Sequence, residues 1–244
     1  MELNYKIFQE PCNPDIKIWR YMDFDKYKYL MNEGALYFSR SDRLKDLFEG
    51  SYPAATSLLY KSLSKQHDKI ENFLSEAKAF RKFVAVNCWH INDSESLEMW
   101  KRYVKSGEGV VVQTTYSRLL NSFSGYKDDN IYCGKVNYID FAKAPIPLQP
   151  LVPFAYKQLV YSYEKELRCL ICRPPIKNGK FDWSLNMIND GIPVSIQIEK
   201  LIEYIYVAPN APAGFDEMVK SALDKNSGNK KLIRRILPSI FRNT

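Results

Sequence analysis

Hydrophobic and polar positions alternate along several short stretches of the chain, and this alternation predicts β-strands. Successive side chains of a strand point to opposite faces, so a half-buried strand shows a period of two. We predict strands at 16–22, 35–41, 83–91, 110–116, 133–141, 161–172 and 192–197, one within 199–209, and a last one near the C-terminus interrupted by Pro238.

Other stretches repeat their apolar residues at helical spacing. We predict helices between Asp23 or Asp25 and Gly34, at 95–106, at 116–123 and at 213–226, and a longer helical insertion at about 54–82. The turn 92–94 can cap the helix at 95–106. Asp is a favoured N-cap residue and Gly a favoured C-cap residue, which supports the bounds of the first helix. The insertion at 54–82 is typical either of packing scaffold or of a lid.

Short strands and helices are interleaved along the whole chain, and no internal repeat is present. The proline-rich segment 144–153 has the composition of a linker. The strands on each side of it are too few for two independent sheets, so we interpret it as a crossover or surface loop. We therefore predict a single α+β domain over 1–244, with a mixed, mostly antiparallel sheet flanked by helices.

The segment YSYEKELRCLIC at 161–172 has the most unusual polar pattern. In a strand, Glu164, Glu166 and Arg168 would point the same way. Two carboxylates and a guanidinium on one face are costly unless they pair with each other or bind a ligand. One interpretation is a structural network of ion pairs with Arg168, Arg20 or Lys157. The other is a functional site.

Charge and cysteine content narrow the function classes. The 244 residues carry a formal net charge of +7, which indicates either solubility alone or an anionic partner such as a nucleotide. An odd count of five cysteines, without an apolar signal segment, is typical of the reducing cytoplasm. Cys169 and Cys172 lie in an apolar run and fit a buried strand. With two histidines in the chain, we expect no metal, and no stretch is apolar enough for a membrane span.

Four motifs resemble the bacterial DUF2971 family, a domain of unknown function. They are WRYMDFDKYKYLMNEGALYFSRSDRLKDLFEG, CWHINDSESLEMWKRYVKSGEGVVVQ, YKQLVYSYEKELR and LIEYIYVAPNAPAGFDEMVKSAL. The family commonly has N-D-P-[FW]-E after the strand that ends in Tyr-Phe-Ser. This chain has Asp46 and Glu49 at the matching positions and Leu47 in place of the proline. The resemblance implies a polar site at Asp46 and Glu49, to which we add Lys157, and it implies no activity.

A second resemblance is to the ADP-ribosyltransferase superfamily, whose split sheet surrounds an NAD cleft. Arg20 matches the early Arg or His, Ser39 matches the Ser or Tyr of a later strand, and Glu166 matches the catalytic Glu of an E-x-E motif. The resemblance implies that NAD is the substrate. It implies catalytic roles for Glu166, Glu164 and Arg20.

The chemistry of such a site is coherent. Cleavage of the nicotinamide–ribose bond passes through an oxocarbenium-like state, which a nearby carboxylate stabilises. A guanidinium fits pyrophosphate, which suits Arg20, and aromatic rings stack on a planar base. Trp100 and Tyr103 are three residues apart on one helix, so they either pack together or wall a ring pocket. The remaining residues that we assign to NAD binding are Tyr21, Ser39 and Arg168.

Two other functions stay open at this point. A metal-dependent nuclease or phosphoesterase would bind Mg²⁺ through Asp46, Glu49, Glu164 and Glu166, with Lys157 or Lys165 nearby. A non-catalytic nucleic-acid or partner-binding module would use the basic tail, which comprises Lys220, Lys225, Lys230, Lys231, Arg234, Arg235 and Arg242. We expect a cytoplasmic protein that binds a nucleotide-like anion, with a protein or nucleic-acid acceptor and no membrane partner. A toxin or phage-defence effector would fit this description.

Overall fold

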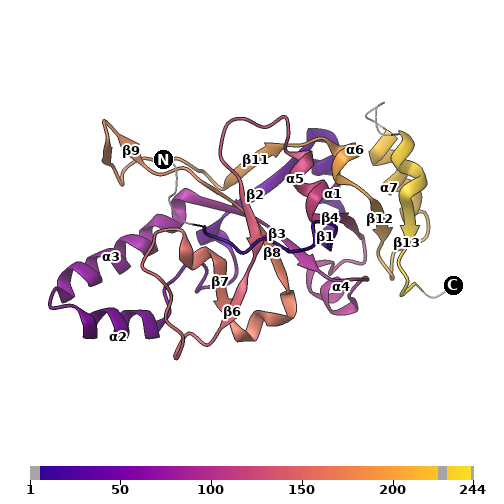
Figure 1. Cartoon of the computed structure of the whole chain (residues 1–244). Helices are drawn as coiled ribbons and strands as arrows, with labels where there is room; N and C mark the ends of the chain where they lie inside the picture. The colour runs from indigo at the N-terminus through magenta and orange to yellow at the C-terminus, as the bar shows by residue number, and fades with distance from the viewer. Residues whose placement is uncertain (1–5, 225–229, 243–244) are drawn as a thin grey trace. The chain divides into compact units, whose positions relative to one another are not determined.

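The computed structural model describes residues 6–224 and 230–242 (Figure 1). The fold class is the predicted one: a single-domain α+β chain with a mixed, mostly antiparallel sheet and flanking helices. Within it, the chain forms two compact units that alternate along the sequence. The first consists of the chain up to Glu10, Phe38–Cys88 and Asp128–Ile192. The second consists of Pro11–Tyr37, Trp89–Lys127 and the chain from Pro193 onward.

Strands of the first unit meet on β8 (Glu166–Cys172), which pairs with β3 (Val84–Ile91) and antiparallel with β5 (Tyr132–Lys135). β3 also pairs antiparallel with β2 (Ala35–Arg40). A core cluster of this unit contains Phe83, Val84, Phe154 and Leu170, all buried. Every residue of β8 from Glu166 to Ile171 is buried, so the charged side chains of this strand lie inside the protein.

Smaller elements complete the first unit. The two helices α2 (Ala54–Leu63) and α3 (His67–Phe80) form a helical hairpin, joined across by an ion pair between Lys61 and Glu71 (Figure 1). The other elements are η1 (Ser41–Arg43), η2 (Arg81–Phe83), β6 (Asn137–Ile139), η3 (Val152–Ala155), β7 (Tyr156–Gln158), η4 (Leu159–Glu164), β9 (Ile176–Lys177) and β10 (Lys180–Phe181). β9 and β10 form a hairpin whose turn residues Asn178 and Gly179 both have positive φ, as a type I′ turn requires.

In the second unit, β1 (Lys17–Asp23) lies between the end of β3 and β4 (Gly109–Thr115), antiparallel to both. β4 pairs antiparallel with β12 (Tyr204–Val207), and β12 pairs parallel with β13 (Ile236–Pro238). All seven residues of β4 are buried. β11 (Gly191–Ser195) is the edge strand that pairs with β2.

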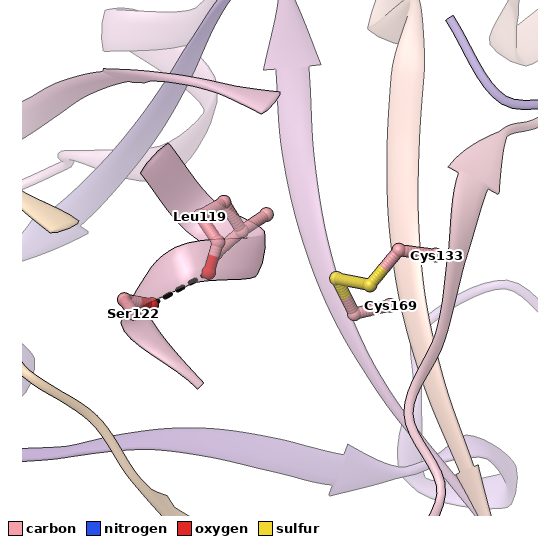
Figure 2. Close-up of a disulfide and its surroundings, with 4 residues drawn as sticks. All are labelled: Leu119, Ser122, Cys133 and Cys169. Carbon is pink, nitrogen blue, oxygen red and sulfur yellow. Dashed lines mark hydrogen bonds between the residues drawn. A yellow bond between two sulfur atoms is a disulfide. The ribbon is translucent and has the colours of Figure 1, made fainter. Parts of the chain in front are cut away.

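Helices of the second unit are α1 (Phe24–Glu33), α4 (Leu97–Tyr103), α5 (Tyr116–Ser122), α6 (Ile198–Leu201) and α7 (Phe215–Asp224), and η5 (Lys230–Arg235) follows. Gly34 ends α1 in the left-handed conformation, as predicted. Asp23 occupies the N-cap of α1, but its side chain makes no capping hydrogen bond. In α5, the Ser122 hydroxyl donates to the carbonyl of Leu119 (Figure 2).

Four sequence predictions need correction. The strand predicted at 161–172 begins only at Glu166, because Leu159–Glu164 form a 3₁₀ helix and Lys165 adopts a left-handed φ of 40°. The strand predicted at 133–141 is divided into β5 and β6, which belong to different sheets. The helical arm at 54–82 is interrupted between Leu63 and His67. Ser96, rather than the 92–94 turn, caps α4, because its hydroxyl accepts from the amide of Met99.

Candidate functional site

Arg168, on β8, is the centre of a buried network of charges in the first unit. Glu166 lies two residues earlier on the same face of the strand, as predicted. Its carboxylate accepts from Arg168 Nε at 2.6 Å and from Arg168 Nη2 at 3.2 Å. Arg168 is fully buried and Glu166 nearly so. This part of the charged face is therefore compensated internally, which removes most of the cost of burying it.

A second carboxylate reaches Arg168 from the turn that follows η1. Asp46 shapes this turn, because its carboxylate accepts from the amide of Phe48 and its carbonyl accepts from the amide of Glu49. The turn therefore forms with Leu47 at the position where DUF2971 proteins commonly have proline. Glu49 is buried, and its two oxygens accept from Arg168 Nη1 at 2.5 Å and Nη2 at 2.9 Å. This bidentate contact is the strongest geometry for an Arg–carboxylate pair.

Lys157, on β7, extends the network toward the surface. Its Nζ donates to Glu164 at 2.5 Å and to Glu166 at 3.2 Å, and it lies 5.1 Å from the centre of the Tyr161 ring. Glu164 ends η4, immediately before the left-handed Lys165 that turns the chain into β8. Glu164 is thus the outermost carboxylate of the network, with 13% of its side chain exposed against 4% for Glu166.

The two carboxylates that share Lys157 have pKa values displaced in opposite directions. Burial alone would raise the pKa of Glu166, but Arg168 and Lys157 outweigh it and lower the pKa to about 2. Burial raises the pKa of Glu164 above its ordinary value, even though Lys157 acts to lower it. The pKa of Lys157 is raised because Glu166, Glu164 and Glu49 together outweigh its own burial. At neutral pH Glu166 and Lys157 are therefore charged.

Sequence reasoning did not identify two further groups that contact Glu166. The Cys88 thiol hydrogen-bonds its carboxylate, and burial raises the pKa of Cys88 well above the usual range. The Tyr138 hydroxyl accepts from the amide of Glu166 at 2.8 Å, and burial also raises the pKa of Tyr138. Their positions depend on the pairing of distant strands, so no local pattern in the sequence indicates them.

The opposite face of β8 carries a disulfide, which joins Cys133 on β5 to Cys169 (Figure 2). These residues are directly paired in the strand register, with Cα atoms 4.2 Å apart. Cys169 is buried in β8, as the sequence predicts, but its bond to Cys133 was not predicted. Cys172 and Cys88 are half-buried and Cys12 is exposed, and these three cysteines form no disulfide.

A cleft of about 190 Å³ opens beside the chain segment that follows Glu49. It is lined by Gly50, Ser51, Tyr52, Pro53, Ala54, Ser57, Leu74, Ala77 and Lys78. Tyr52 is fixed there by donating its hydroxyl proton to the carbonyl of Gln149. None of the five charged side chains of the network lines this cleft.

The residues of the predicted NAD site and of the predicted polar site fall into both units. Ser39, Asp46, Glu49, Lys157, Glu164, Glu166 and Arg168 belong to the first unit, and Arg20, Tyr21, Trp100 and Tyr103 belong to the second. Seven residues are thus in one unit, and five of them form the charge network. A ligand shared by Arg20 and Glu166 stays a prediction.

Aromatic side chains of the second unit are arranged differently from the prediction. Trp100 is buried and makes an edge-to-face contact with Tyr21 at 5.1 Å, whereas Tyr103 is 43% exposed. With only 3% exposure, Trp100 has no free ring face for a ligand, so the two do not wall one ring pocket. Tyr21 accepts from the amide of Ser96 at 2.7 Å. The Arg20 guanidinium lies over the ring of Trp89 at 5.9 Å.

The second unit also contains a buried carboxylate, Glu95, that sequence reasoning did not identify. It accepts from the indole of Trp100 at 2.8 Å, from the hydroxyl of Ser239 at 2.6 Å and from the amide of Ile240 at 3.0 Å. These bonds hold the C-terminal segment against α4. Of the basic tail, Arg242 pairs with Asp216 and Lys220 with Glu217, while Lys225 lies outside the described residues.

Comparison with known proteins finds no matching family model, no similar curated protein and no similar solved structure. The resemblances to DUF2971 and to ADP-ribosyltransferases therefore stay predictions. Over residues 6–224 and 230–242, no three His, Cys, Asp or Glu side chains are grouped so that they could hold a metal ion. The helices in the same ranges are all too short or too polar to cross a bilayer.

Proposed function

We propose that the protein cleaves the nicotinamide–ribose bond of NAD, as a glycohydrolase or as an ADP-ribosyltransferase, with Glu164 as its acid/base group. The observation that carries this proposal is the contrast between Glu164 and Glu166. They are two residues apart and share Lys157, yet their pKa values are displaced in opposite directions. Such a separation is the usual arrangement of two carboxylates with different roles in glycosyl chemistry.

Exposure determines which carboxylate contacts the substrate in this proposal. Arg168, Lys157 and Cys88 take up the oxygens of Glu166, so Glu166 is a positioning residue. Glu164 is partly exposed and is the catalytic residue. Lys157 orients Glu164, and the ion pair between Glu49 and Arg168 fixes the buried end of the network.

With water as the acceptor, the proposed reaction is hydrolysis of the nicotinamide–ribose bond. The bond between ribose C1′ and the nicotinamide nitrogen breaks, and its electron pair leaves with nicotinamide. A water oxygen bonds to C1′, and ionised Glu164 takes the proton that this water loses. In the transferase version, a nucleophilic group of a protein or nucleic acid replaces water.

A metal-dependent nuclease is less well supported by the same contacts. The predicted Mg²⁺ ligands are Asp46 and three glutamates, Glu49, Glu164 and Glu166. The glutamate oxygens already accept from Arg168 and Lys157, whose charged groups occupy the space next to them. We therefore do not propose metal-dependent hydrolysis.

The test is release of nicotinamide from NAD by the purified full chain. Glu164→Gln keeps the size of the side chain but cannot take up a proton. We expect it to lower the rate by about 100-fold or more, the usual effect of removing a general base. Glu199→Gln is the matched control, because Glu199 is exposed on α6 in the second unit, and it should release nicotinamide at the wild-type rate.

Two results would contradict the proposal. One is that the folded wild-type protein releases no nicotinamide above the rate without enzyme. The other is that Glu164→Gln retains the wild-type rate. In both cases circular dichroism of the same samples would show that the chain is folded.

A further inference from the structure

Arg81, the first residue of η2, is a buried arginine without a carboxylate partner among the described residues. Its exposure is 9%. Its Nη1 donates to the carbonyl of Leu47 at 3.3 Å, a long hydrogen bond, and its Nε has no hydrogen-bond partner. A guanidinium remains charged at any pH that the protein meets.

This arrangement differs from that of the other buried arginine, Arg168, which is bound by two carboxylates and a carbonyl. It also differs from Arg118, whose Nε is likewise unpaired but whose Nη2 donates to the carbonyls of Glu199 and Ile202 at the end of α6. Arg118 therefore has an evident structural role. A buried charge without a counter-charge is costly, so Arg81 calls for an explanation that the protein's own contacts do not supply.

The structure holds Arg81 firmly in place on both sides. The Ser41 hydroxyl donates to the Arg81 carbonyl at 2.7 Å, and the side chain of Arg81 donates to Leu47 in the turn that delivers Glu49. The next residue, Lys82, is exposed and adds a second positive charge. A fixed guanidinium with unused donors is preorganised for an anion that accepts several hydrogen bonds.

We propose that Arg81 anchors a binding site for a phosphate group, formed where η2 meets the 41–48 segment. Phosphate fits because its oxygens are strong acceptors for guanidinium donors and its negative charge would offset the buried positive charge. This inference goes beyond NAD cleavage, since phosphate binding at Arg81 requires no catalysis.

Aromatic side chains beside Arg81 indicate which phosphate compounds to compare. Phe80 contacts the ring of Phe181 at 6.5 Å, and Phe83 contacts that of Trp183 at 5.9 Å. Phe181 and Trp183 stack on each other and are 50% and 42% exposed. The residues on either side of Arg81 thus support an exposed aromatic pair. Such a pair suits a nucleotide base, so AMP is the informative companion to inorganic phosphate.

The experiment is calorimetric titration of the full chain with inorganic phosphate and, separately, with AMP, at constant ionic strength set by chloride. We expect wild-type protein to bind phosphate and Arg81→Met to bind it at least about tenfold more weakly, since one charge-assisted contact is worth that much. Arg102→Met is the control. It removes the same charge from an exposed arginine that pairs with Glu98 on α4, and it should bind phosphate as wild type does.

The AMP titration separates the two sources of the phosphate group. Tighter binding of AMP, reduced to the phosphate level by Trp183→Ala, would identify a nucleotide. Equal binding would identify free phosphate. Either result supports a phosphate site at Arg81 if the binding is weakened in Arg81→Met.

A second measurement avoids substitution altogether. Phosphate should shift the NMR signal of the unpaired Arg81 Nε–H in wild-type protein and slow its exchange with water. The proposal is overturned if wild-type protein binds neither ligand, if Arg81→Met binds them as wild type does, or if the Nε–H signal is unchanged at saturation. Each outcome is independent of nicotinamide release, so failure of this site and failure of the catalytic proposal are distinguishable.

Discussion

Arg168 shows how a single residue can set the charge state of its surroundings. Its guanidinium is buried among Glu49, Glu166 and the carbonyl of Phe154, and it keeps Glu166 ionised where burial alone would favour the neutral acid. The sequence indicated that Glu166 and Arg168 share a strand face. It could not indicate Glu49, which is 119 residues away and meets Arg168 only in the fold.

The lowered pKa of Glu166 predicts a defined dependence of stability on pH. The folded pKa of Glu166 is about 2, against an ordinary value of 4.5. Its ionised form therefore adds to the free energy of unfolding above pH 4.5, and this addition is lost as pH falls toward 2. The amount is on the order of 3 kcal/mol. Glu164 acts in the opposite sense. Because its pKa is raised, the contribution of Glu164 to the free energy of unfolding is largest at low pH. That contribution is lost as pH rises through the pKa of Glu164 in the folded protein.

Glu166→Gln tests this at the residue scale. The substitution leaves Lys157 and Arg168 undercompensated, so we expect the free energy of unfolding at pH 7 to fall by about 3–5 kcal/mol. The variant should also lose the decline in stability that wild type shows between pH 4.5 and 2. Urea unfolding at a series of pH values measures both. Equal stability of Glu166→Gln and wild type at pH 7 would contradict the description of the network.

At the scale of elements, the turn from Asp46 to Gly50 positions the most distant member of the network. Gly50 has a φ of 63°, and a side chain at this position would overlap the ring of Phe154. The backbone must pass close to that ring for Glu49 to reach Arg168. This is why a residue without a side chain follows Glu49.

We therefore expect Gly50→Ala to destabilise the protein by about 1–3 kcal/mol, from the unfavourable φ and the displaced ring. Thermal unfolding followed by circular dichroism measures the effect. Gly179→Ala is a matched control, since Gly179 also has a positive φ, of 76°, but has open space where a side chain would begin. If Gly50→Ala loses no more stability than Gly179→Ala, the close approach of Gly50 to Phe154 does not matter for stability.

Elements were predictable where the pattern was strong. β1, β2, β3 and β4 lie close to their predicted ranges, because each has apolar positions that recur as a buried strand requires. The structure of region 159–165 could not be predicted. Its polar and aromatic residues alternate as in a strand, whereas residues Leu159–Glu164 form a 3₁₀ helix. The left-handed conformation at Lys165 has no signal in the sequence, because glycine is the usual residue there.

At the scale of the whole molecule, the disulfide conflicts with the reducing cytoplasm that the cysteine count indicated. Disulfides persist in oxidising compartments, so the two observations give different expectations for the purified protein. The pairing was not predictable, because Cys133 and Cys169 become neighbours only through the register of β5 and β8. The cytoplasmic location stays a prediction.

Thiol counting tests the disulfide directly. Protein quenched in acid and alkylated in denaturant without reductant should show three reactive cysteines, Cys12, Cys88 and Cys172. The bond closes a loop with a sequence separation of 36, so Cys133→Ala should lower stability by about 2–4 kcal/mol. Cys12→Ala, at an exposed free thiol, should leave stability unchanged. Five reactive thiols in wild-type protein would rule out the bond.

The candidate residues predicted from the sequence belong to two compact units that alternate along the chain. The charge network lies wholly in one unit. The central claim therefore depends on Glu164 and its neighbours there and does not require Arg20.

The most direct test of that claim is the rate of nicotinamide release from NAD as a function of pH. In wild-type protein we predict a rate that rises with pH as Glu164 ionises, because Glu164 must be ionised to accept the proton. Burial raises its pKa, so this rise lies at higher pH than for an ordinary glutamate. In Glu164→Gln this rise should be absent and the rate low throughout. Release that is missing at every pH, or a profile that is identical in both proteins, would contradict the account.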